Sequence, residues 1–111
     1  MKTIFAAVLL AAITTQASAG YLDGNKLHDV CRKQDDAAGP AMLYALGVVD
    51  GVSDLGSILN LEKLKFCMPE GVTARQLGDV VCLFLQNSPG DRQSSAASLV
   101  MGAVLETWPC E

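Results

Sequence analysis

The chain has 111 residues, a formal net charge of −4 at pH 7, four cysteines and one histidine. This length suits one small domain. An acidic domain is not attracted electrostatically to nucleic acid or to an anionic membrane surface, so both are excluded as expected partners.

The first 19 residues have the layout of a secretory signal peptide. Lys2 gives a positive start, Ile4 to Ile13 is an unbroken apolar run, and Ala17-Ser18-Ala19 matches an A-x-A cleavage site. The run is too short for a membrane span, which takes about 20 apolar residues. The sequence therefore predicts a signal peptide at 1–19, no membrane insertion, and an exported, periplasmic domain at 20–111.

All four cysteines lie in the part that would be exported, at Cys31, Cys67, Cys82 and Cys110. An even number of cysteines in a small exported domain indicates a disulfide framework. The count alone leaves three pairings open. No cysteine lies near the expected cleavage site, so a lipid anchor is not expected.

Residues 23–33 and 40–59 have helical periodicity. Asp23 is the expected N-cap of the first helix, and Pro40 opens the second. The expected inner face of the second helix consists of Leu43, Leu46, Val49 and either Val52 or Ser53. Gly47 and Gly51 stand four residues apart, which indicates either close contact with another helix or simple tolerance of glycine.

Two further helices are expected at 73–87 and from Ser94 or Ser95 to Trp108. Thr73 and Gln76 match the capping box that opens many helices, and Pro109 ends the last helix. No sustained alternation typical of strands occurs. The sequence predicts an all-α fold, a small disulfide-braced bundle of about four helices.

The sequence contains no motif that predicts a catalytic or metal-binding site. The lone His28 has no expected reactive thiolate beside it, there is no CxxC motif, and the cysteine spacing matches no zinc site. Asp50 and Asp54 are better explained by a solvated helix face than by acid–base catalysis. We therefore expect no enzymatic activity, no cofactor and no metal, and a role in binding.

The order of several short motifs resembles the Rap–Tai immunity family. These motifs are YLDG at 21–24, YALGVVDG at 44–51, FCMPEGVTARQLGDVVCLFLQ at 66–86, SPGDR at 88–92 and AASLVMGAVLETWPC at 96–110. Members of that family are exported bacterial proteins that neutralise peptidoglycan amidase toxins delivered by type VI secretion. The resemblance implies a helical domain, often a homodimer, that blocks the active-site cleft of its toxin without catalysis or cofactor.

One departure from the family pattern affects the disulfides. Members often carry a cysteine early in the second helix, where this chain has Ala41-Met42-Leu43, and Cys82 lies in the third helix instead. The pairing of the four cysteines is therefore predicted from the rigid backbone beside Cys67 and Cys110. Pro69 and Gly71 hold Cys67 in a defined turn, and Pro109 fixes Cys110, so we predict a Cys67–Cys110 bond, which leaves Cys31 with Cys82.

The loop NSPGDRQS is the longest polar connection between two firm helices, and binding residues often lie on such loops. The candidate toxin-binding residues are Asn87, Ser88, Asp91, Arg92 and Gln93. Alanine at Asp91 and Arg92 is expected to weaken binding without changing melting. An ordinary helix–helix turn is the alternative, in which case the QDD stretch at 34–36 or the face with Asp50 and Asp54 would contact the partner.

A second function of a different class is a small periplasmic chaperone or envelope-stress protein of the HdeA-like helical kind. Such a chaperone would expose apolar surface as its carboxylates become protonated at low pH. Suppression of client aggregation at low pH would distinguish it from an immunity protein.

Overall fold

The computed structural model describes residues 21–33 and 39–111. These residues form four α-helices, α1 (Gly24–Arg32), α2 (Gly39–Leu59), α3 (Ala74–Asn87) and α4 (Ala96–Thr107), and two 3-10 turns, η1 (Glu62–Leu64) and η2 (Pro89–Asp91). The prediction of an all-α bundle is confirmed. The expected signal peptide and the QDD stretch lie outside the described residues.

Three of the helices begin at side-chain caps. Asp23 accepts a hydrogen bond from the backbone N–H of Lys26 at 2.8 Å. The Thr73 hydroxyl accepts from the Gln76 N–H at 3.1 Å, and the Gln76 side chain accepts from the Thr73 N–H at 2.8 Å. This is the capping box that the sequence predicts, and such a cap contributes about 1 kcal/mol. Ser95 caps α4 in the same way.

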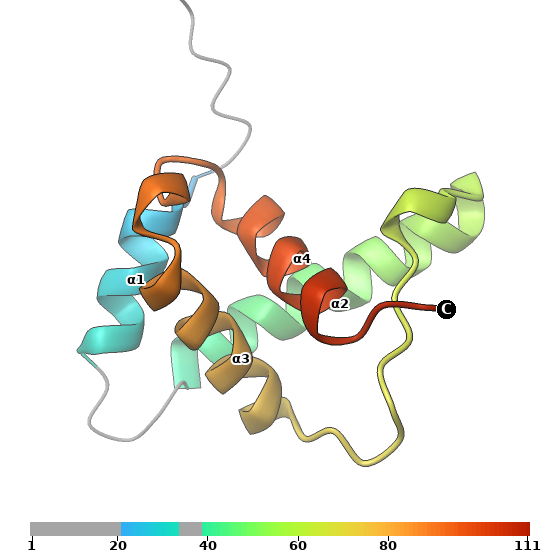
Figure 1. Cartoon of the computed structure of the whole chain (residues 1–111), viewed down its shortest axis with the longest axis horizontal. Coiled ribbons are helices and arrows are strands. Elements are labelled where there is room, and N and C mark those ends of the chain that lie inside the picture. The colour runs from blue at the N-terminus through green and yellow to red at the C-terminus, as the bar shows by residue number, and fades with distance from the viewer. Residues whose placement is uncertain (1–20, 34–38) are drawn as a thin grey trace, which may run out of the picture.

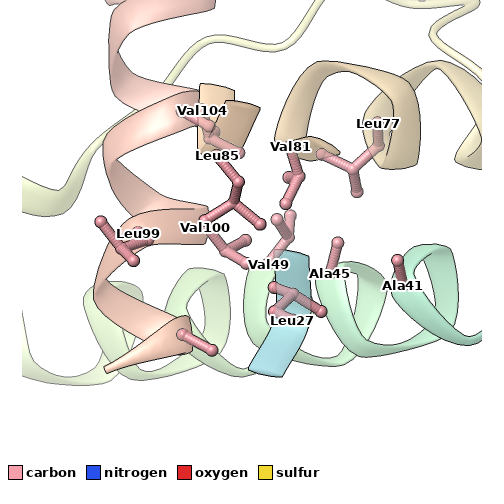
Figure 2. Packing of buried hydrophobic residues seen from close by; sticks show 12 residues of the cluster. Leu27, Ala41, Ala45, Val49, Leu77, Val81, Leu85, Leu99, Val100 and Val104 are labelled. Carbon is pink, nitrogen blue, oxygen red and sulfur yellow. The ribbon is translucent and has the colours of Figure 1, made fainter. Parts of the chain in front are cut away.

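The core forms where the other three helices meet the first half of α2. Figure 2 shows Leu27 of α1, together with Val81 and Leu85 of α3, pointing toward this meeting point. α4 contributes Val100 and Val104, both fully buried. Each such side chain contributes roughly 1.5–3 kcal/mol through burial. The small domain therefore has one core, supported by two disulfides.

The buried face of α2 differs from the predicted one. It consists of Ala41, Ala45 and Val49, whereas Leu43 is 65% exposed. Small alanine side chains let α3 and α4 approach the axis of α2 closely, and larger leucines at those positions would hold them apart. The prediction weighted leucines over alanines. It was right at Val49, which is buried, and in part at Leu46, which is half-buried and packs against the core.

Gly47 and Gly51 lie on an exposed face of α2, and a Cβ built on either would meet no atom within 4 Å. Of the two alternatives, close contact of these glycines with another helix is therefore wrong for the described part of the chain, and simple tolerance of glycine agrees with the structure.

The second half of α2 extends beyond the core. In Figure 1 it leads away from α1 and α3, and the yellow connection turns back from its far end and reaches α3 at the bottom of the view. By length and composition alone, Gly39–Leu59 is the one described helix that could cross a membrane. In the fold, its first half packs against α3 and α4.

The disulfides join Cys31 to Cys82 and Cys67 to Cys110, the same pairs that the sequence analysis favours. The first connects α1 to α3. The second joins the connection before α3 to the chain end after α4, where the Cys67 N–H also donates to the Trp108 carbonyl at 2.9 Å. The C-terminal residues are thus held by a covalent bond and a backbone bond.

Candidate protein-binding site

The predicted binding loop is short and mostly turn. Asn87 ends α3, η2 occupies Pro89–Asp91, and α4 begins at Ala96. The side chains of Asn87, Asp91 and Gln93 are exposed, whereas Ser88 and Arg92 are half-buried. Three of the five predicted residues are therefore accessible to a partner.

Arg92 is occupied within the protein. Its Nε donates to the Leu85 carbonyl at 2.6 Å and its Nη2 donates to the Gln86 carbonyl at 3.0 Å. These carbonyls lie in the last turn of α3, where helix carbonyls lack the usual N–H donor four residues later. The Leu85 carbonyl also accepts a long bond from the Ser88 N–H at 3.4 Å. Arg92 is therefore a helix cap, and its replacement should lower stability, contrary to the expectation that melting stays unchanged.

The loop is also attached to α1 by its backbone. The Gly24 N–H donates to the Ser94 carbonyl at 2.9 Å and the Asn25 N–H donates to the Arg92 carbonyl at 2.8 Å. On the other side of this junction, the Ala96 N–H donates to the Leu22 carbonyl at 2.9 Å. These three backbone hydrogen bonds hold the loop and the start of α4 against α1 and the residues before it.

A hollow of about 490 Å³ adjoins the loop, between α1 and α3. We call it the α1–α3 hollow. Its charged lining comprises His28 and Arg32 of α1, Asp79 of α3, and Arg92. The Cys31–Cys82 bond also lines it and joins its two walls covalently.

The surroundings of His28 in the hollow change its pKa. Its burial, and then the charges of Arg92 and Arg32, lower its pKa below the usual value of 6.5, while Asp29 acts in the opposite direction. The sequence alone treats His28 as a lone histidine without a reactive thiolate and gives no prediction of the hollow. The one feature of the sequence that could have indicated the hollow is the spacing of His28 and Arg32, which stand four residues apart on one helix face.

A second surface lies at the far end of α2. We call it the apolar tip and define it as Leu55, Ile58, Leu59 and Leu61. Ile58 is 77% exposed and Leu59 is 59% exposed. A groove of about 250 Å³ lies beside the tip, between α2 and the segment around η1. Contiguous exposed apolar side chains of this kind mark interaction surfaces.

Potential metal ligands are dispersed. Among residues 21–33 and 39–111, no group of three or more His, Cys, Asp or Glu side chains is placed to hold a metal ion. Of the two surfaces, the α1–α3 hollow is lined by charged side chains and the tip is apolar.

The family model of Rap1a immunity proteins matches residues 23–110. The chain belongs to this family. The match spans all four helices and both disulfides, and it confirms the resemblance found in the sequence. No curated protein and no solved structure gives a significant match. As a member of the Rap1a immunity proteins, the chain has the role of an immunity protein, which implies a toxin as its partner.

Proposed function

We propose that this protein is an exported, periplasmic immunity protein that binds a peptidoglycan amidase delivered by type VI secretion and occludes its catalytic cleft. The observation that carries the proposal is the family match over residues 23–110. Inhibition is steric, and the protein contributes no catalysis or cofactor.

The toxin contact is assigned to the loop at 87–93. Its backbone is fixed by bonds to α1, and the side chains of Asn87, Asp91 and Gln93 project into solvent. A surface that is already ordered loses little conformational entropy on binding, so more of the interaction energy remains as affinity. This supports tight occlusion by a small domain.

Export is supported by the sequence of residues 1–19 and by the cysteines. All four are consumed in disulfides, and such bonds persist in oxidising compartments such as the periplasm. A toxin that cuts peptidoglycan has its substrate in the same compartment.

The apolar tip is assigned to a second copy of the chain, in line with the homodimer that the family resemblance implies. In a two-fold symmetric dimer, the same patch of each copy contacts its counterpart. The tip of α2 carries both projecting side chains, Ile58 and Leu59, and a groove beside them. These features suit such self-association.

Binding and inhibition test the proposal directly. The purified protein would be mixed with a type VI amidase from the same genome. The active amidase is used to measure peptidoglycan hydrolysis, and an inactive variant of it is used to measure binding affinity by calorimetry. We expect a stoichiometric complex and loss of hydrolysis. The double variant Asp91→Ala/Gln93→Ala should weaken binding at least tenfold, corresponding to about 1.4 kcal/mol.

The matched control is Glu106→Ala, an exposed acidic residue on α4 outside both the loop and the groove. It should bind like the wild type. If the double variant binds the amidase as tightly as the wild type, the toxin-binding surface lies outside the loop. Absence of a complex with the wild-type protein would contradict the proposed function itself.

A further inference from the structure

The α1–α3 hollow has a local charge opposite to that of the whole chain. The chain is acidic, with a formal net charge of −4. Within the hollow, two arginines and a histidine face a single carboxylate, that of Asp79. A partner with an acidic group would therefore be repelled by most of the surface and attracted here.

The lining charges are not neutralised by one another. Within the part of the chain that the structure describes, neither Arg32 nor Asp79 has a partner within ion-pair distance. Arg92 uses Nε and Nη2 to hold the end of α3, which fixes its guanidinium group rigidly at the wall of the hollow. The hollow thus presents a fixed cation and a free one.

Arginine is well suited to carboxylates. Its planar guanidinium carries several N–H donors in a fork that matches the two carboxylate oxygens, and such charge-assisted bonds are stronger than neutral ones. His28 lines the same hollow, and its burial, followed by the charges of Arg92 and Arg32, lowers its pKa. An arriving carboxylate would favour the protonated imidazole and add a further donor.

We propose that the α1–α3 hollow binds an Asp or Glu side chain of the toxin. This proposal rests on the proposed function, and it names the chemistry of the partner beside the loop at 87–93. Gln86 lines the hollow and Asn87 follows it, so one partner surface can meet the loop and place an acidic side chain in the hollow.

The first test needs no toxin. An acidic peptide, acetyl-Gly-Glu-Gly-Glu-Gly-amide, would be titrated into the ¹⁵N-labelled protein at low ionic strength, with the lysine analogue as its control. We expect saturable shifts of the amide signals of His28, Arg32 and Leu83 with the acidic peptide alone. The shifts should weaken on addition of salt, because salt screens exposed charges.

Two variants separate recognition from folding. Arg32→Glu should abolish the saturable shifts. Asp79→Asn removes the single opposing charge and should strengthen peptide binding about twofold to threefold. A gain of affinity cannot arise from a misfolded protein. Absence of saturable shifts in the wild type, or equal affinity in all three proteins, would overturn the proposal. Equal shifts with acetate alone would also overturn it by identifying a general anion site.

The second test uses the inactive amidase. Arg32→Glu should weaken the complex at least tenfold, since it removes a charge-assisted hydrogen bond and places a like charge beside the acidic side chain. Arg75→Glu, an equivalent reversal at an exposed position outside the hollow, should leave affinity within twofold. Equal losses for the two reversals would reject the hollow while leaving immunity intact, whereas no complex with the wild type would reject the proposed function.

Discussion

The loop lies close against α1 at Gly24. A Cβ at this position would lie 2.7 Å from the Arg92 carbonyl oxygen and 2.9 Å from the Arg92 Cα, and both are backbone atoms. Neither can move easily, because the Gly24 N–H also holds the Ser94 carbonyl. The glycine therefore allows the loop to lie against the helix.

Gly24→Ala should lower the free energy of unfolding by about 1–3 kcal/mol, the usual cost of overpacking. Gly47→Ala is the matched comparison, since an added Cβ there meets nothing within 4 Å. That change should raise stability by about 0.5–1 kcal/mol. Chemical denaturation measures both, and a Gly24→Ala protein as stable as the wild type would contradict the packing described.

Arg92 and Asp91 are adjacent but differ in role. Arg92→Ala removes two donors from the end of α3 and should lower the free energy of unfolding by about 1–2 kcal/mol. Asp91→Ala should change it by less than about 0.5 kcal/mol, because the carboxylate is exposed. Thermal melting of the two variants distinguishes the cap from the contact residue, and equal melting temperatures would contradict the assignment.

His28 gives a pH dependence with a definite sign. Its pKa is lower in the folded protein than its usual value of 6.5, so the unfolded chain binds more protons there. Above pH 6.5 the imidazole is neutral in both states, and the free energy of unfolding does not depend on it. As the pH falls through 6.5 toward the folded pKa, the unfolded chain takes up the proton first, and the free energy of unfolding decreases. Denaturation of the wild type and of His28→Gln between pH 8 and 5 should diverge below 6.5, and parallel curves would contradict it.

Helix boundaries were predictable from the sequence because local chemistry sets them. Asp23, Thr73 and the serine at position 95 are caps whose side chains bond to backbone N–H groups three residues later, and such motifs depend on few neighbours. The pairing of cysteines followed from the stiff turns at Pro69 and Pro109.

The buried face of α2 and the hollow were not predictable in the same way. On α2 the choice between leucines and alanines depends on how closely α3 and α4 approach, which is a property of packing. The α1–α3 hollow combines His28 with Arg92, residues distant in the chain that come together only because the loop docks on α1. The periodicity of one helix contains no information on which residues of other segments lie beside it in the fold.

The apolar tip supports a prediction about α2 as an element. Ile58→Asp/Leu59→Asp places two charges on a surface assigned to a second copy of the chain. We expect a dimeric wild type and a monomeric variant in analytical ultracentrifugation, with unchanged helicity. The control is Leu83→Asp, another exposed apolar position, on α3, which should remain dimeric. A monomeric wild type would contradict this use of the tip.

The two disulfides brace the molecule as a whole. They close chain separations of 51 and 43 residues, and each should contribute about 2–4 kcal/mol. Replacing Cys67 and Cys110 together by serine should lower the free energy of unfolding by that amount. Unreduced peptide mapping checks the pairing, and a peptide that joins Cys31 to Cys67 would contradict it.

The central claim is that this domain protects the periplasm from an amidase toxin. The most direct measurement is survival of cells that express a periplasm-targeted type VI amidase from the same genome, with this protein supplied with or without residues 1–19. We predict that the full chain rescues growth and that the form without residues 1–19 does not. Lysis that continues while the folded protein accumulates in the periplasm, for every amidase of this class, would contradict the claim and favour a chaperone role.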